Sequence, residues 1–300
     1  MKNILVVGSM NMDLVVNTDE IPRVGETILG NSLSQIPGGK GANQGVAMAK
    51  LNGDVTFLGK VGRDSFGSSL LKSMNEAGVN TVGVEEISES TGIAVINVDK
   101  NGNNNIVVIP GANWKVDYNY LHRHISAFEK SDIVVFQLEI PLETVKEGLK
   151  IAKKLGKTTI LNPAPARDLD DETISYIDIL VPNEHELERM TGIEVTDEES
   201  MLKAANILLN KGVKKIIVTL GSKGALYIDE ETHKFYDAYK VKVVDTTAAG
   251  DSFIGGFTSY FVKDGNIEEA IDMGQKTAAL SIQKFGAQSS LPTKAEVENF

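Results

Sequence analysis

Short runs of apolar residues, rich in Val and Ile, recur along the chain. They span residues 4–7, 55–58, 133–136, 159–161, 179–181 and 216–219, with amphipathic stretches between them. Hydrophobicity within each run is continuous rather than alternating, which is typical of strands covered on both faces. The pattern therefore predicts an α/β fold, in which helices flank a central, mostly parallel sheet in a Rossmann-like three-layer arrangement.

The amphipathic stretches carry clear start and stop signals for helices. Asp64 is placed to cap a helix that runs to Ala77 and stops at Gly78. Pro141 stands at the start of another helix, which is expected to end near Leu155, before a glycine. A cap or a proline at the beginning and a glycine at the end are the usual boundaries of helices in parallel α/β proteins.

Two regions, at about residues 13–36 and 91–110, break this rhythm. Their extended stretches are followed by turn residues instead of helices, and Asn101, Gly102 and Asn103 predict a hairpin turn. We therefore expect residues 1–300 to form one α/β domain. The two irregular regions are expected to form a small β-sheet lid over a site.

Composition narrows the class of protein. The chain has 300 residues, 42% of them hydrophobic and 8 of them proline, which is enough to bury a substantial core. Its 41 acidic and 30 basic residues give a net charge of -11 without a basic patch, so nucleic acid is not an expected partner.

Two further features bear on the compartment. The absence of cysteine excludes disulfides and thiolate chemistry and fits a reducing cytoplasm. The first apolar run stops at Gly8, which is too short for a signal-peptide core or a membrane span. A cytoplasmic location without membrane contact is therefore expected.

The segment 245–253 has the composition of an anion site. Small residues precede a helix whose buried face is expected to hold Phe253, Phe257 and Tyr260, and Asp251 falls in the first turn of that helix. Free backbone N–H groups and the helix dipole attract phosphate at such a place. A carboxylate there is either a general base for an attacking hydroxyl or simply a favourable first-turn acid, and both interpretations stay open.

A second glycine-rich segment, residues 37–44, leads into a helix. Its adjacent glycines allow close approach to a ligand, and Lys40 and Asn43 offer hydrogen-bond donors. It lacks the spacing of a Walker A loop, because Ser34 stands in place of the first glycine and Gly41 follows the lysine. It does not match the dinucleotide-binding fingerprint either, so a ligand loop and a plain loop are both open.

Polar residues follow several of the predicted strands. Asn11 and Asp13 come after the first, Glu139 after the third, and Asn183 and Glu186 after the fifth. The loop 219–224 closes another strand with small residues. Parallel sheets gather ligand groups at the carboxyl ends of their strands, although each residue is also an ordinary turn former.

Taken in order, these segments resemble the ribokinase family within the larger group of ribokinase-like (PfkB) carbohydrate kinases. The resemblance runs over residues 7–292 and is most specific at 245–253, 38–44, 162–167 and the pair Asn183 and Glu186. It implies an enzyme that uses ATP to phosphorylate D-ribose at the 5-hydroxyl, giving ribose 5-phosphate and ADP. Kinases for deoxyribose, fructose or adenosine, and a non-catalytic sugar or nucleotide sensor, remain alternatives.

The resemblance also implies roles for individual residues. Asp251 would be the general base, and the backbone of Ala248, Ala249 and Gly250 the anion hole. The sugar hydroxyls would contact Asn11, Asp13, Gly39, Lys40, Asn43, Glu139 and Asp251. The nucleotide and Mg²⁺ would be held by Asn183, Glu186, Thr219, Gly221, Ser222, Gly224, Gly250 and Gln275, the last at a position where His or Asn is expected.

Family members also share a monovalent-cation site and a lid through which they pair. A potassium site would here use, largely through backbone oxygens, Asp245, Thr247, Ser281, Lys284, Gly286 and Ser290. A homodimer formed through the lid is likewise expected. An oxidoreductase that uses a dinucleotide would share the parallel sheet, but the residues after the first strand do not form the glycine fingerprint it needs.

Overall fold

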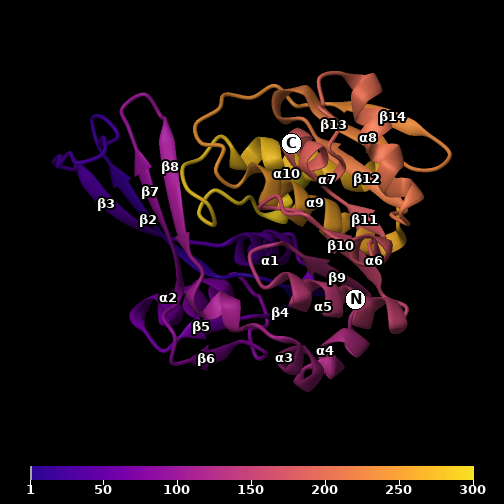
Figure 1. Cartoon of the computed structure of the whole chain (residues 1–300), viewed down its shortest axis with the longest axis horizontal. Helices are drawn as coiled ribbons and strands as arrows, with labels where there is room; N and C mark the ends of the chain where they lie inside the picture. The colour runs from indigo at the N-terminus through magenta and orange to yellow at the C-terminus, as the bar shows by residue number, and fades with distance from the viewer. Residues whose placement is uncertain (1) are drawn as a thin grey trace.

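An eight-stranded sheet forms the centre of the computed structural model, which describes residues 2–300 (Figure 1). The strand order is β14-β13-β12-β11-β10-β9-β1-β4. The strands are β1 (Asn3–Val7), β4 (Asp54–Leu58), β9 (Ile133–Phe136), β10 (Thr158–Leu161), β11 (Ile179–Leu180), β12 (Lys215–Thr219), β13 (Gly224–Ile228) and β14 (His233–Asp237). All six predicted strands are present and pair in parallel, which confirms the α/β class.

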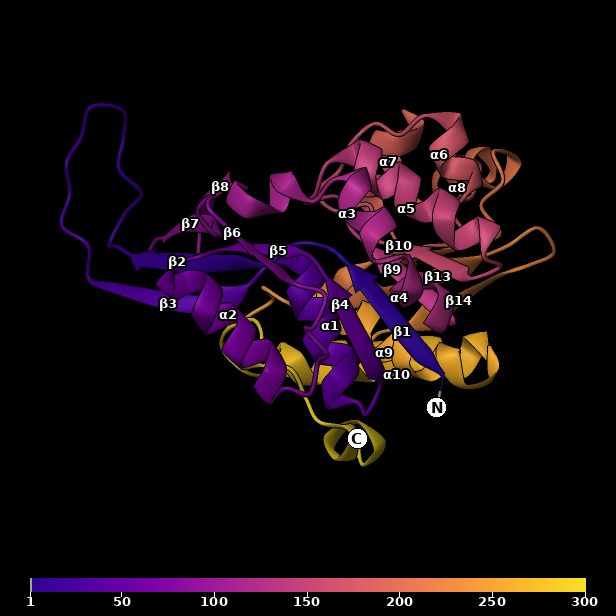
Figure 2. The same cartoon turned by 90° about the horizontal axis from the view of Figure 1, so that it is seen from below.

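Helices cover both faces of this sheet, as Figure 2 shows. One layer holds α1 (Lys40–Lys50), α2 (Ser65–Glu76), α9 (Ala249–Asp264) and α10 (Ile267–Ser281). The other holds α3 (Tyr118–Arg123), α4 (Ile125–Lys130), α5 (Leu142–Lys154), α6 (Asp171–Ser175), α7 (Glu184–Thr191) and α8 (Glu198–Asn210). Leu5 and Val7 pack into the second layer, whereas Ile4 and Val6 pack into the first, because side chains alternate along a strand.

The predicted helix boundaries are confirmed at both places. Asp64 caps α2 by accepting a hydrogen bond from Gly67 N at 2.8 Å, and the chain turns at Gly78 with φ +91°. Helix α5 follows Pro141 and ends at Leu155, before a glycine with φ +68°.

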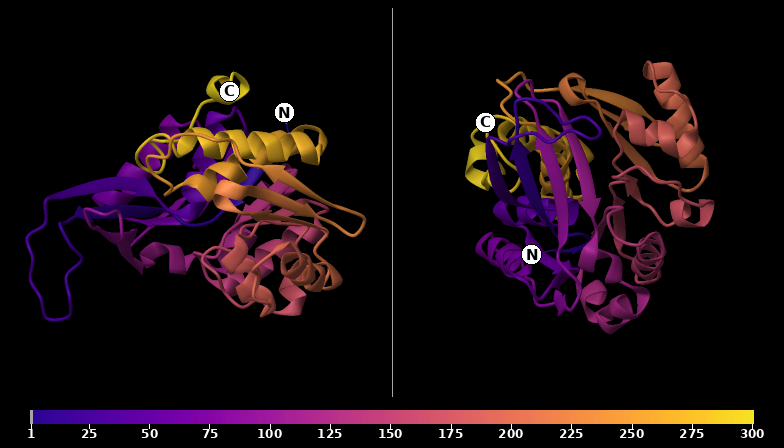
Figure 3. Two further views of the ribbon diagram at one scale, coloured as in Figure 1. Left: turned by 90° about the horizontal axis from the view of Figure 1, so that it is seen from above. Right: turned by 60° about the vertical axis from the view of Figure 1, so that its left-hand side comes forward.

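A second, smaller sheet projects from one end of the molecule (Figure 3, left). Its order is β3-β2-β7-β8, from β2 (Asn11–Asn17), β3 (Ser32–Gly38), β7 (Gly92–Val98) and β8 (Asn104–Ile109). Strands β7 and β8 form the predicted hairpin, whose turn includes Gly102 at φ +84°. The separate sheet is thus confirmed, and Asn11 and Asp13 lie within it rather than in a turn.

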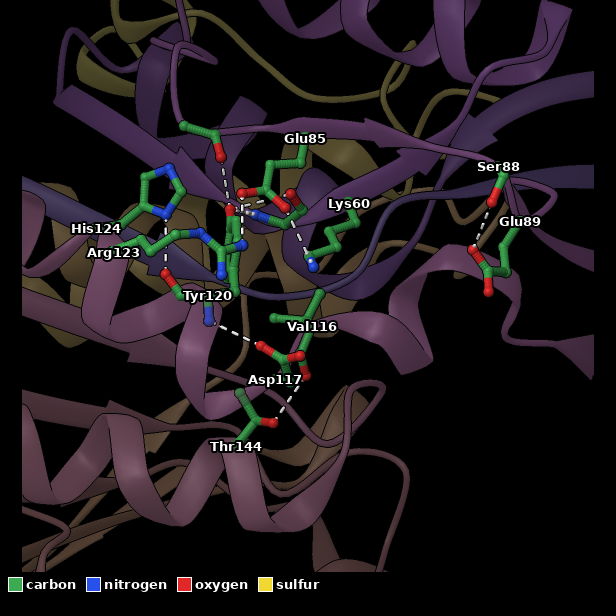
Figure 4. Close-up of polar contacts among 12 residues, drawn as sticks. Lys60, Glu85, Ser88, Glu89, Val116, Asp117, Tyr120, Arg123, His124 and Thr144 are labelled. Carbon is green, nitrogen blue, oxygen red and sulfur yellow. Dashed lines mark hydrogen bonds and ion pairs between the residues drawn. The ribbon is translucent and has the colours of Figure 1, made fainter.

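A two-stranded sheet of β5 (Lys60–Gly62) and β6 (Glu85–Ile87) lies below the small sheet. Figure 4 shows how it is fastened to α3. The buried Tyr120 hydroxyl accepts from Gly59 N at 2.8 Å and donates to Gly83 O at 2.6 Å. Glu85 lies between the Lys60 ammonium (3.2 Å) and the Arg123 guanidinium (2.8 Å), which closes the same junction.

Several short elements were not predicted from the pattern. Strands β13 and β14 form an antiparallel hairpin on the edge of the main sheet, joined to β12 by the 3₁₀ turn η2 (Gly221–Lys223). A second 3₁₀ turn, η1 (Gly111–Lys115), precedes α3, and α11 (Lys294–Glu298) lies near the carboxyl end. Within residues 2–300, none of the helices combines the length and apolar character needed to cross a membrane.

Candidate active site

The candidate residues meet at the carboxyl ends of the parallel strands, next to the base of the small sheet. Strands β1, β9, β10, β11 and β12 all end at this edge, because they run parallel to one another. Helices α1 and α9 begin at the same edge and lie side by side (Figure 1). The site therefore combines strand ends with two helix N-termini, which together favour an anionic ligand.

The glycine-rich segment brings α1 into backbone contact with the end of β1. Gly39 has φ +90°, and a Cβ built on it would lie 2.6 Å from Asn11 N. A Cβ on Gly41 would lie 2.6 Å from Ser9 N. Neither position has room for a side chain, so these glycines are required by the close crossing of two backbones.

Glu139 organises the sugar-binding candidates. Its Oε2 atom accepts hydrogen bonds from Ser9 Oγ at 2.5 Å, from Lys40 N at 3.1 Å and from Asn11 Nδ2 at 3.4 Å. The carboxylate thus joins the ends of β1 and β9 to the start of α1. Its Oε1 atom accepts no hydrogen bond from residues 2–300 and is available to a ligand hydroxyl.

Asn113, which the sequence did not single out, fixes the position of Asn11. It lies in η1 and is fully buried. Its amide donates to Asn11 Oδ1 at 2.8 Å and to Met10 O at 3.1 Å, and it accepts from Met10 N at 2.9 Å. The separation of 102 positions between Asn11 and Asn113 explains why no local motif pointed to this contact.

Asp251 lies in the first turn of α9, as predicted, and is 6% exposed. Each of its carboxylate oxygens accepts one hydrogen bond from α1, at 3.0 Å from Asn43 Nδ2 and at 3.0 Å from Gln44 Nε2. Burial raises the pKa of Asp251, against the lowering effect of the Lys40 ammonium and of the two amides. A raised pKa makes this carboxylate a better proton acceptor than an ordinary aspartate.

Gln44 connects Asp251 to the core of the main sheet. Its amide donates one N–H to Asp251 and the other to Asn162 Oδ1 at 3.1 Å, and its oxygen accepts from Gln137 Nε2 at 2.6 Å. All four side chains are at least 90% buried. Because both N–H groups and the oxygen of the Gln44 amide are hydrogen-bonded, the amide is held in one orientation, and it fixes the direction of the Asp251 carboxylate.

Charge in the site is dominated by acidic groups. Burial lowers the pKa of Lys40, but the carboxylates of Asp251, Glu139, Glu186 and Asp13 outweigh it, so its pKa is raised overall. Burial, followed by the charges of Glu139 and Asp251, raises the pKa of Asp13 to about 7. The Lys40 ammonium, with four carboxylates around it, therefore stays protonated. The Asp13 carboxyl titrates near neutral pH.

Backbone donors at the start of α9 are partly free. The Ala249 N–H donates to Thr246 O at 3.1 Å. The N–H groups of Ala248, Gly250 and Asp251 have no acceptor within residues 2–300. A Cβ built on Gly250 would meet no atom within 4 Å, so the space beside Gly250 at this helix start is open. An anion approaching here would meet N–H groups and the positive end of the helix dipole.

A cavity of about 460 Å³ opens beside this helix start. Its lining includes all of the nucleotide-binding candidates on the β12–β13 turn, Thr219, Gly221, Ser222 and Gly224, together with Gly250 and Gln275. Gln275 Nε2 donates to the backbone oxygens of Tyr236 (3.0 Å) and Asp237 (3.2 Å). Residues 219–224 thus form a turn that also lines a cavity, and their role in binding a nucleotide stays a prediction.

Part of the cavity wall comes from a segment for which the sequence indicates no binding role. Ala238, Tyr239, Lys240, Val241 and Val243 line it, between β14 and the segment that leads to Asp245. Tyr239 is held by a 2.6 Å hydrogen bond from its hydroxyl to Asp272 Oδ1. Irregular backbone without a motif gives no sequence signal, so this wall became visible only in the fold.

Asn183 and Glu186 form a reciprocal helix cap at the start of α7. Asn183 Oδ1 accepts from Glu186 N at 2.8 Å, and Glu186 Oε2 accepts from Asn183 N at 2.9 Å. Burial raises the pKa of Glu186. Its Oε1 atom accepts no hydrogen bond within residues 2–300, so one hard oxygen ligand remains for a divalent cation with its waters. No group of three His, Cys, Asp or Glu suited to a metal occurs in that range.

Three of the six residues expected at a monovalent-cation site, Asp245, Thr247 and Gly286, are joined by hydrogen bonds, whereas the carbonyl of Ser281 already accepts from Lys284 N at 3.0 Å. Asp245 Oδ1 accepts from the N–H and hydroxyl of Thr247, and Asp245 Oδ2 accepts from Gly286 N at 2.9 Å. The Lys284 ammonium is paired with Glu296 at 2.7 Å, which leaves its backbone oxygen as the available ligand. The carbonyl oxygens of Asp245, Thr247, Lys284, Gly286 and Ser290 accept no hydrogen bond within residues 2–300, a donor set that fits a hard monovalent ion.

The sequence of this chain is similar to known proteins over nearly its whole length. Residues 1–294 match the family described as pfkB family carbohydrate kinase. A ribokinase of Haemophilus influenzae is 41% identical over 100% of this chain and 98% of its own length. A deoxyribokinase of Salmonella typhi is 41% identical over 97% of this chain and 96% of its own length.

A solved structure shows the same fold. The ribokinase of Arabidopsis thaliana, complexed with ribose and ATP, superposes with a TM-score of 0.93 at 32% identity. The match covers 100% of this chain and 98% of that one.

Proposed function

The chain belongs to the pfkB family of carbohydrate kinases and is a sugar kinase, and we propose that it transfers the γ-phosphoryl group of ATP to the 5-hydroxyl of D-ribose. The observation that carries this proposal is the position of Asp251. Its buried carboxylate lies between the sugar candidates of α1 and the free N–H groups of Gly250 and of Asp251 itself. A proton acceptor and an anion site at the start of one helix are what phosphoryl transfer to an alcohol requires.

In the proposed reaction, Asn11, Asp13, Lys40, Asn43 and Glu139 bind the sugar hydroxyls and direct the primary hydroxyl toward Asp251. The carboxylate accepts the hydroxyl proton while the sugar oxygen forms a bond to the γ-phosphorus. The bond from phosphorus to the β–γ bridging oxygen breaks, and ADP leaves with the electron pair. The free N–H groups at the start of α9 stabilise the charge on the transferring group.

The cavity lined by the β12–β13 turn and by Gln275 would hold the nucleotide of ATP, the substrate with which the Arabidopsis relative was solved. Glu186 would hold Mg²⁺ through water, and the free carbonyls near Asp245 would hold K⁺. When bound, these ions would offset the negative charge of the phosphates and of the developing transition state.

The assay that tests this proposal measures ADP release with ATP and Mg²⁺ on D-ribose, 2-deoxyribose, fructose and adenosine, each with and without potassium. Turnover on ribose that rises with potassium is the expected result. The deoxyribokinase relative at equal identity makes 2-deoxyribose the second candidate, and faster turnover on it would replace ribose as the acceptor. Binding of sugar and ATP without turnover on any acceptor would instead indicate a sensor.

The small sheet would close over the sugar and pair two copies of the chain. Its edge strand β8 is exposed along its whole length, and Ile106, Val107 and Val108 are each about half exposed. An apolar edge strand of this kind is a ready pairing surface. Light scattering should give the mass of a dimer, and Val107→Lys should give a monomer.

A further inference from the structure

Lys50 connects the sugar side of the site to the loop that would hold the monovalent cation. It is the last residue of α1, the helix that begins with Lys40 and carries Asn43 and Gln44. Its ammonium donates to Gln288 O at 2.9 Å and to Leu291 O at 3.0 Å. Within residues 2–300, no carboxylate lies within ion-pair distance of it, so its charge acts on these carbonyls.

The contacted loop, residues 284–291, is fixed on its other side by Asp245. Gly286 N donates to Asp245 Oδ2 at 2.9 Å, while Asp245 Oδ1 accepts from Thr247. Thr247 directly precedes the anion-hole segment that begins at Ala248. A path of direct contacts thus runs from α1 through the loop to the start of α9.

The carbonyl oxygens of this loop fall into two groups, those that accept a hydrogen bond from Lys50 and those that do not. The oxygens of Gln288 and Leu291 each accept a hydrogen bond from the ammonium, whose charge disfavours a second cation beside them. Those of Lys284, Gly286 and Ser290 accept no hydrogen bond within residues 2–300. Burial, followed by the charge of Lys284, lowers the pKa of Lys50, and the charge of Glu296 offsets this only in part.

We propose that Lys50 is a positioning residue for the monovalent-cation site: by holding the carbonyls of Gln288 and Leu291, it presents the remaining loop carbonyls to K⁺ beside the anion hole. This role rests on the proposed function, because the cation site itself belongs to that proposal. It extends the proposal to a residue outside the expected ligand set. It also makes the helix that contacts the sugar part of the support for the cation.

The test compares Lys50→Met and Lys50→Arg with a control, Ser73→Ala. Ser73 Oγ donates to Gln288 Oε1 at 2.8 Å, so this control removes a contact with the same loop but not with its carbonyls. The first readout is the rise in Tm produced by KCl relative to tetramethylammonium chloride at constant ionic strength, without ATP or sugar. The second is the potassium concentration that gives half-maximal kinase activity.

Lys50→Met should lose most of the potassium-specific rise in Tm and need about tenfold more potassium, as is usual when a supporting contact of a metal site is removed. Lys50→Arg should recover part of the response, and Ser73→Ala should keep the wild-type response even if its Tm is lower. A wild-type potassium response in Lys50→Met would overturn the proposal, and if that variant does not fold, a wild-type response in Lys50→Gln decides in the same way.

Absence of any potassium effect in the wild-type protein would remove the cation site and this role together. It would leave the sugar-kinase activity to be judged separately, by ADP release.

Discussion

Gln44 donates a hydrogen bond to Asp251 Oδ1 at 3.0 Å from a fully buried position on α1, and no other side chain joins that carboxylate directly to the core of the main sheet within residues 2–300. The amide stabilises the charged carboxylate and sets its direction, whereas burial opposes the charge. A residue of the neighbouring helix α1 therefore influences both the proton affinity and the orientation of Asp251, the proposed base.

Replacing Gln44 with Met should remove this donor with little change in volume. We expect turnover to fall by about tenfold or more, because a misaligned base loses part of the usual 10²–10⁴-fold contribution. The acid limb of the pH profile of kcat/KM should move to higher pH, since the pKa of Asp251 rises without the amide. Gln137→Met is the matched control, because it removes a contact of Gln44 and leaves the donor to Asp251 in place. An unshifted profile in Gln44→Met would show that Gln44 only fills space.

Asp251→Asn tests the base itself. The amide keeps the shape of the side chain but cannot accept the proton, so turnover should fall by roughly 10²–10⁴-fold. Titration calorimetry should find sugar and nucleotide affinities close to those of the wild-type protein. Turnover near the wild-type rate would remove Asp251 from the role, and loss of both affinities would assign it to binding.

Gly250→Ala separates folding from function at the anion site. The new methyl group meets no protein atom within 4 Å, and alanine favours a helix over glycine by about 1 kcal/mol, so Tm should rise slightly. The same methyl group would project into the open space beside Gly250, which lines the cavity next to the free N–H groups. We expect kcat/KM for ATP to fall on the order of 10²-fold, as for other small displacements of a reacting group. A more stable variant with full activity would show that the phosphate does not bind at this helix start.

Asp13→Asn tests whether the partly buried negative charge of Asp13 in the proposed sugar site lowers stability. The pKa of Asp13 is about 7 in the folded protein, against 3.8 ordinarily, so the folded state binds more protons than the unfolded state between these values. Stability from this group is therefore present at low pH and is lost as pH rises toward 7. The variant should be more stable than wild type above pH 7, by on the order of 2 kcal/mol, and should lose this advantage near pH 4. Denaturant unfolding at both pH values measures it, and an advantage independent of pH would contradict the assignment.

The sequence predicted the main sheet well because each parallel strand is covered on both faces and reads as an unbroken apolar run. Strand β14 was missed for the opposite reason, since it lies at the sheet edge and is mostly exposed. Among site residues, those in local motifs were brought together as expected, including Lys40, Asn43 and Asp251. Their roles in binding and catalysis stay predictions.

Residues whose work depends on distant partners could not be found in this way. Asn113 acts on Asn11 from 102 positions away, and Gln44 is separated from Asp251 by 207. The anion hole was predicted from the sequence only in part. A run of small residues predicted free N–H groups at Ala248, Ala249 and Gly250, but only the fold shows that the one on Ala249 is already used by Thr246.

The crossing of backbones at Gly39 and Gly41 sets a boundary for redesign of the acceptor specificity. At this part of the proposed sugar site main chain packs on main chain, so a side chain added at either glycine would separate α1 from the segment that follows β1. The walls contributed by the small sheet are side chains, with Asp13 opposite Ala94 in the register of β2 and β7. Directed evolution toward a different acceptor should therefore accumulate its changes in the small sheet while the glycines stay invariant.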